Sequence, residues 1–211
     1  METPRPSDIQ NVFALNKPQH MLSKLLWEID SLSTSLSVWT KKTEFPAPLF
    51  IVWNAVITAW HITDWLWQST PEVRAILAKR YKLKFVEGSK NAQREGLEEF
   101  QDAVARDSRF LYVCREIANG SKHMRKNEID PDVTALARWL PVIQGAGHVV
   151  PGDLTLSLVI IDGDNEQDAS RWLIQAFGYW EQVFTQENLV SIQNRLPDTV
   201  INPLPRSDRS F

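Results

Sequence analysis

Two short stretches place polar side chains at helical spacing, where they could carry acid–base or phosphate chemistry. In the first, Arg115, Asn119 and His123 are four residues apart, and Lys122 stands beside the last of them. On a continuous helix such a line drifts by about 40° per step, so the side chains stay on one flank. A guanidinium, an amide, an ammonium group and an imidazole in one line can grip a phosphate and transfer a proton. The alternative interpretation is a solvated helix face that ends in a histidine.

The second stretch places a carboxylate among aromatic rings. Asp64 shares a stripe at steps of three and four residues with Trp53, Trp60 and Trp67, and His61 lies three residues before it. A buried carboxylate needs a charge partner or several hydrogen-bond donors. One interpretation is that His61 and Asp64 support a site at the edge of the core. The other is that Asp64 accepts a hydrogen bond from a tryptophan N–H or an arginine and only fixes the helix register.

A third interpretation of the same residues is a metal site built from His61, Asp64 and His123. A His-x2-Asp pair fits one helix face, and helical bundles do hold metals between facing helices. Two histidines and one carboxylate also arise easily by chance, so we expect no bound metal and no cofactor. The spacings of a P-loop, a dinucleotide fingerprint, a nucleophile elbow and a zinc finger are not found in the sequence.

Helical periodicity predicts the elements that position these residues. Ser69-Thr70-Pro71-Glu72 is typical of a capping box at a helix start. Asn119-Gly120-Ser121 leaves one end open: the helix stops there, which would dissolve the line of polar residues, or it runs on through Arg125. The predicted helices cover residues 18–39, 48–68, 70–82, 91–119 and 167–187.

A strand is predicted before the last helix, because Leu154 to Ile161 alternate with a period of two. Pro151-Gly152 is turn chemistry, so the partner strand is either His148–Val150 or Arg138–Ile143. The predicted fold is mainly α (α+β): a four-helix bundle with an extra short helix and a small antiparallel β-hairpin at about 133–163. We expect one domain over residues 18–195, an N-terminal arm at 1–17 and a poorly ordered tail at 196–211.

Composition sets the class of protein. The 211 residues are 43% hydrophobic and 23% charged, with a formal net charge of −3, which excludes a disordered chain and a globally basic nucleic-acid binder. A lone cysteine, Cys114, and an N-terminus without signal-peptide features favour a cytoplasmic protein. The apolar stretch Leu49–Trp67 includes His61 and Asp64, so we interpret it as a buried helix and expect no membrane contact.

Nine tryptophans are unusual for this length. Trp65 and Trp139 are the candidates for exposed rings that stack on nucleobases. The others with helical spacing are predicted to be core residues: Trp39, Trp53, Trp60, Trp67, Trp172 and Trp180.

The segments Trp60–Trp65 and Cys114–His123, followed by a hairpin and a last helix, resemble a group of bacterial proteins that are similar to the HEPN superfamily of helical bundles. The resemblance covers most of residues 20–190 in architecture and these two motifs in sequence. HEPN ribonucleases work without metal, usually as dimers, with an Arg-x(4–6)-His motif near the end of the third helix. Here the spacing is Arg-x7-His, and Glu116 follows the arginine where Asn, Asp or His is typical.

The resemblance implies a metal-independent RNA-cleaving or RNA-phosphate-binding site, with a toxin or phage-defence role and a homodimeric state. In this hypothesis His123 is the general acid or base, and Arg115 and Lys122 stabilise phosphate charge. Asn119 orients the phosphate, while His61 and Asp64 support the site. The departures from the motif favour the alternative, a non-catalytic module that binds a protein partner or RNA and whose polar motif is structural.

Overall fold

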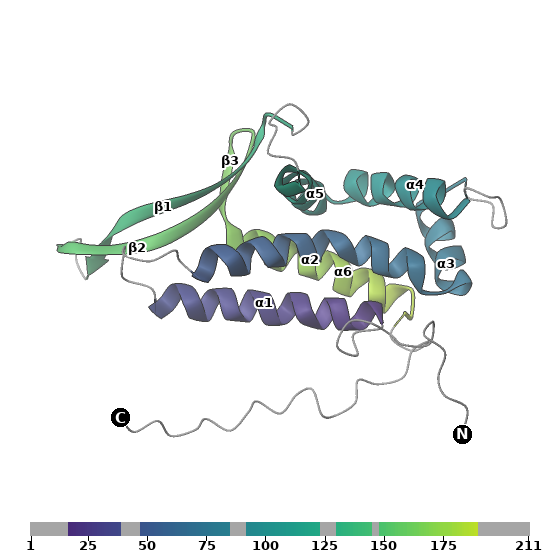
Figure 1. Ribbon diagram of the computed structural model, residues 1–211, viewed down its shortest axis with the longest axis horizontal. Helices are drawn as coiled ribbons and strands as arrows, with labels where there is room; N and C mark the ends of the chain where they lie inside the picture. Colours follow the sequence, from purple (N-terminus) through teal and green to yellow (C-terminus); the bar gives the residue numbers. More distant parts are fainter. Residues whose placement is uncertain (1–16, 39–46, 85–91, 123–129, 145–147, 190–211) are drawn as a thin grey trace, which may run out of the picture.

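A computed structural model describes residues 17–38, 47–84, 92–122, 130–144 and 148–189 (Figure 1). These residues form a mainly helical α+β structure with a small antiparallel sheet before the last helix. The elements in chain order are α1 (Pro18–Val38), α2 (Ala47–Ser69), α3 (Pro71–Tyr81), α4 (Ala92–Asp107), α5 (Arg109–Lys122), β1 (Val133–Gln144), β2 (His148–Asp162), β3 (Asn165–Asp168) and α6 (Ala169–Gln186).

Helix α2 is the central element. It packs against α1, α3, α4, α5 and α6, and Figure 1 shows it lying along α1 and α6. Ala59, Ile62 and Leu66 are almost fully buried along it. By length and composition α2 is the one candidate membrane span among the described helices, and less than half of its apolar window is buried in this structure.

Buried tryptophans fix the helices to one another. Trp60, Trp67, Trp172 and Trp180 are buried, as predicted, while Trp39 lies outside the described residues. Three of these rings donate their indole N–H to a backbone carbonyl of another helix, which meets the need of a buried donor for an acceptor. The pairs are Trp67 with Gln93 (2.9 Å), Trp172 with Phe110 (3.0 Å) and Trp180 with Ala59 (2.8 Å).

The prediction for Trp53 was wrong, because its side chain is 48% exposed. Trp27 on α1, at 66%, is the other strongly exposed indole among the described residues. Trp65 and Trp139, the predicted stacking candidates, instead pack partly buried against the core.

The predicted long helix over 91–119 is two helices, α4 and α5, separated at Ser108. The buried Ser108 hydroxyl accepts the N–H of Leu111 at 3.4 Å, which begins a new helix. In Figure 1 α4 lies across the view while α5 is seen nearly end-on, so the two axes diverge. Helix α5 then continues through Gly120 to Lys122, so it does not stop at Gly120; Arg125 lies outside the described residues.

The hairpin lies where the sequence predicts it, but its turn does not. Strand β2 pairs antiparallel with β1, and Pro151-Gly152 lies inside β2, where the register shifts between Pro141 and Ile143. The expected turn there was therefore wrong; it is an irregularity of the ladder. Strand β3 was not predicted, and Gly163, with φ of +57°, makes the tight turn that leads into it.

Candidate functional site

A polar hollow opens between α2, α4 and α5, with a volume of about 450 Å³. Helix α2 contributes residues at one-turn spacing, α4 places a second row opposite, and α5 closes one side. The residues lining this polar hollow are Trp60, His61, Asp64, Glu98, Gln101, Asp102, Arg115 and Asn119.

Four of the six predicted site residues meet in this hollow. His61 and Asp64 come from α2, and Arg115 and Asn119 come from α5, more than fifty residues later in the chain. Lys122 is the last residue of α5, and its side chain lies outside the described part. His123, the predicted acid or base, lies outside the described residues altogether.

The Arg115 guanidinium is held in place by its neighbours. Its Nη1 lies 2.8 Å from Oδ1 of Asp102, and its Nε lies 3.8 Å from the Glu116 carboxylate. The guanidinium carbon also lies 5.8 Å from the centre of the Trp60 ring, within the range of a cation–π contact. Arg115 is therefore preoriented, and its charge is already compensated by acidic side chains.

Asp64 is half-buried at the hollow wall, and not enclosed by tryptophan rings as its stripe suggested. The Gln101 side-chain amide donates to the Asp64 carboxylate at 3.3 Å and to the Thr63 hydroxyl at 3.1 Å. Neither Gln101 nor Asp102 was singled out from the sequence, since neither carries a spacing signal. Only the packing of α4 against α2 brings them to the site.

The polar hollow is acidic. Among its lining residues, the carboxylates of Asp64, Glu98 and Asp102 outnumber the one guanidinium, that of Arg115. A phosphate group inside this space would meet more negative than positive charge, so the hollow by itself favours hydrogen-bond donors over anions. Carboxylates beside an imidazole are nevertheless suited to proton transfer.

The basic run from Arg74 to Lys84 does not form one cationic face. Arg74 is buried and donates to the carbonyl oxygen of Trp67 at 3.3 Å. Arg80 pairs with Glu187 at 2.7 Å. Only the lysines of the run are exposed, so it gives less support to RNA binding than the sequence suggested.

The described residues contain no group of three or more His, Cys, Asp or Glu side chains arranged to hold a metal. The alternative metal site needs His123, which lies outside those residues. Cys114 is buried, and burial raises the pKa of its thiol to about 12, so it is a core residue and not a nucleophile at neutral pH.

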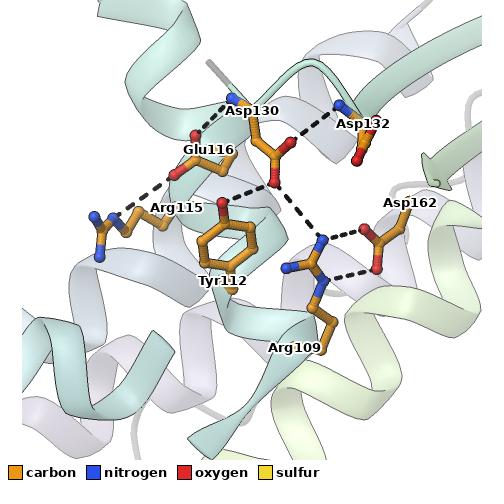
Figure 2. Close-up of polar contacts among 7 residues, drawn as sticks. All are labelled: Arg109, Tyr112, Arg115, Glu116, Asp130, Asp132 and Asp162. Atoms are coloured by element: carbon orange, nitrogen blue, oxygen red, sulfur yellow. Dashed lines mark hydrogen bonds and ion pairs between the residues drawn. The ribbon is translucent and has the colours of Figure 1, made fainter. Parts of the chain in front are cut away.

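Glu116, which follows Arg115 in the sequence, has a structural partner. It is 8% exposed, and its carboxylate accepts the backbone N–H of Asp130 at 3.1 Å (Figure 2). The Asp130 carboxylate in turn accepts the Tyr112 hydroxyl at 2.8 Å and the N–H of Asp132 at 3.0 Å. Glu116 therefore anchors the chain where it enters β1.

Arg109 continues this network to the other strand of the hairpin. Its guanidinium makes a two-bond contact with Asp162 at the end of β2, lies 3.7 Å from Asp130, and covers the Tyr112 ring (Figure 2). The N–H of Asp132, the Tyr112 hydroxyl and Arg109 together lower the pKa of Asp130. The contact with Asp130 raises the pKa of Tyr112. The network joins α5 to the open end of the β1–β2 hairpin, where β1 begins and β2 ends.

Comparison with known proteins adds no relative: no family model matches the chain, and neither a curated protein nor a solved structure shows significant similarity to it.

Proposed function

We propose that this is a HEPN-like protein with a metal-independent RNA-cleaving or RNA-phosphate-binding site at the polar hollow. The observation that carries the proposal is the convergence of His61, Asp64, Arg115 and Asn119 on one hollow. The four residues lie on two separate helices, α2 and α5, and their types and spacing in the sequence predict a shared polar site. We also propose that the helices form a four-helix bundle that carries the hairpin.

The proposed chemistry is attack of a ribose 2′-hydroxyl on the adjacent phosphorus. A base takes the hydroxyl proton, the O–P bond forms as the bond to the 5′-oxygen breaks, and an acid returns a proton to that oxygen. His123 serves as acid or base, and Arg115 and Lys122 stabilise the charge on the phosphorane. Asn119 orients the phosphate, while His61 and Asp64 support the proton transfer.

The acidity of the hollow favours a phosphate at its rim over one in its interior. Arg115 is balanced by Asp102, so the remaining positive charge has to come from Lys122 and from Arg125-Lys126, just after α5 in sequence. We therefore propose that the phosphodiester lies near the C-terminal end of α5, while donor-bearing parts of the nucleotide face the carboxylates. On the resemblance to HEPN proteins we propose a toxin or phage-defence role and a homodimer, and on the lone Cys114 we propose a cytoplasmic protein.

Cleavage of a mixed RNA pool in the presence of EDTA tests this function. We expect the wild-type protein to shorten the RNA, and His123→Ala and Arg115→Gln to reduce the rate about 100-fold or more, as for loss of an acid–base or charge-stabilising group. His20→Ala, on α1, is the matched control and should cleave like wild type. If wild type and His123→Ala leave the pool equally intact, the protein is not a ribonuclease.

A second candidate function is a non-catalytic interaction module that binds a protein or RNA partner. The contacts Arg115–Asp102 and Gln101–Asp64 favour it, because they join α5 to α4 and α4 to α2. In that case Arg115→Gln, Asp102→Asn and the double variant would show a coupling free energy of unfolding of about 0.2–1 kcal/mol. None of the three would change RNA cleavage.

A further inference from the structure

An apolar groove lies between the N-terminal half of α2 and the β1–β2 strands, apart from the polar hollow. Its volume is about 450 Å³. Phe50 and Trp53 on α2, which are 59% and 48% exposed, form one wall, and Ala135 on β1 and Leu158 on β2 lie on the other. Figure 1 shows the hairpin reaching past the beginning of α2. All the residues that line this apolar groove are apolar.

The groove is open along an edge strand. Strand β1 lies at the edge of the sheet and, within the described residues, pairs only with β2. Ala135 and Ala137 stand opposite Ile160 and Leu158, so their small side chains share the face that lines the groove. An edge strand beside an apolar trough is suited to an extended segment, which adds backbone hydrogen bonds and inserts side chains.

The size of the patch points to a short segment and not to a folded partner. Half-exposed Phe and Trp rings such as Phe50 and Trp53 together leave about 200 Å² of ring surface to cover. A stable interface between folded proteins takes about 800 Å² from each partner. The groove therefore offers too little apolar surface to hold a second copy of the chain by itself.

The C-terminal part of this chain is long enough to reach the groove. Its last described residue, Leu189, lies near the start of α1, where the Gln19 side chain donates to its carbonyl at 2.6 Å. Ala169, at the other end of the 18-residue α6, lines the groove. The gap is about 27 Å, the length of α6, and residues 190–199 cover about 33 Å when extended.

The N-terminal arm is too short for the same contact. Its apolar residues run from Ile9 to Leu15. From Lys17 an extended chain spans at most about 29 Å to Ile9 and about 18 Å to Val12. Because α1 begins at the same end of the molecule as Leu189, at most the single Ile9 side chain comes within reach of the groove. Beyond residue 199, by contrast, the chain carries Val200, Ile201 and Leu204.

We propose that the segment Thr199–Leu204 of this chain binds in the apolar groove of the same molecule, alongside β1. Val200, Ile201 and Leu204 supply the apolar contacts with Phe50 and Trp53. Pro197 and Pro203 lack N–H donors, which confines backbone pairing with β1 to the residues between them. The proposal is independent of the RNA site.

Paramagnetic broadening in the full-length protein tests the contact. Cys114 is buried, with a pKa of about 12, so a Ser207→Cys variant has one reactive thiol for a nitroxide label. We expect the label to broaden the methyl signals of Ala135 and Ala137, independently of protein concentration. Ile201→Asp should remove the broadening, and Asn202→Asp, the adjacent polar position, should keep it.

Three results would overturn the proposal. One is an absence of broadening at Ala135 and Ala137 in a protein whose other signals match those of wild type. The second is broadening that appears only between a spin-labelled molecule and a separate isotope-labelled molecule, because the occupant would then be a second copy. Retention of the broadening in Ile201→Asp would contradict the apolar contact itself.

Discussion

The Glu116 carboxylate accepts the Asp130 N–H at the entry to β1. We expect Glu116→Ala to lower the free energy of unfolding by about 1–3 kcal/mol, because the buried acceptor is lost. Glu116→Gln keeps an acceptor oxygen and should lose less. Chemical denaturation measures both, with the exposed Glu95→Ala on α4 as the control. Equal stability of Glu116→Ala and the control would contradict the anchoring role.

Asp130 gives the fold an acid-sensitive contact. The Asp132 N–H, the Tyr112 hydroxyl and Arg109 lower its pKa below the usual 3.8. A carboxyl with a lowered folded-state pKa adds stability that is complete above its unfolded-state pKa and is lost as pH falls through the folded-state value. We expect the denaturation midpoint of wild type to fall below about pH 4, and Asp130→Asn to show a shallower dependence in the same titration. Identical pH profiles would contradict this assignment.

Residue types and spacing predicted half of the polar hollow. His61, Asp64, Arg115 and Asn119 share helix faces that periodicity reveals. Gln101 and Asp102 were not predictable, because their place depends on how α4 packs against α2. Trp53 was misassigned for a related reason. Helical periodicity predicts which face of the helix a residue lies on, but it does not predict how far along that face neighbouring helices pack, and the Trp53 side chain is exposed.

At the level of elements, two neighbouring hydroxyl groups at the start of α3 have different roles. The sequence predicts a capping box from Ser69, whereas Thr70 is the cap and accepts the Val73 N–H at 3.3 Å. The Ser69 hydroxyl donates back to the Leu66 carbonyl. Thr70→Ala should therefore cost about 0.5–2 kcal/mol of unfolding free energy and Ser69→Ala less, as measured by thermal denaturation. If Ser69→Ala lost more stability than Thr70→Ala, the cap would be Ser69, as the sequence predicts.

Element types were predictable and two of their boundaries were not. The break at Ser108 occurs without glycine or proline, inside a continuous helical pattern, so only the buried hydroxyl bond to Leu111 marks it. Pro151-Gly152 has the chemistry of a turn, yet the longer β2 strand carries it as an irregularity. Local sequence signals of this kind indicate which conformations a segment can adopt, and tertiary pairing determines which of these conformations forms.

On the scale of the whole molecule, Arg109 connects the helices to the sheet through Asp162 and Asp130. We expect Arg109→Gln to speed amide hydrogen exchange in β1 and β2 while α2 keeps its protection, since local opening precedes global unfolding. Hydrogen–deuterium exchange read by mass spectrometry measures this. Arg94→Gln, on the exposed Arg94–Glu98 pair of α4, is the control. Unchanged exchange in both strands would show that the hairpin is held by its apolar contacts alone.

The polar hollow and the apolar groove are built on the same two helices. Helix α2 lines the groove with Trp53 and the hollow with Asp64, and α5 lines the groove with Ile117 and the hollow with Arg115. A ligand that alters the separation of α2 and α5 at one of these places changes the free energy of binding at the other. Thermodynamic linkage makes the effect mutual. If a ligand in the groove changes the affinity of the hollow by some factor, a ligand in the hollow changes the affinity of the groove by the same factor.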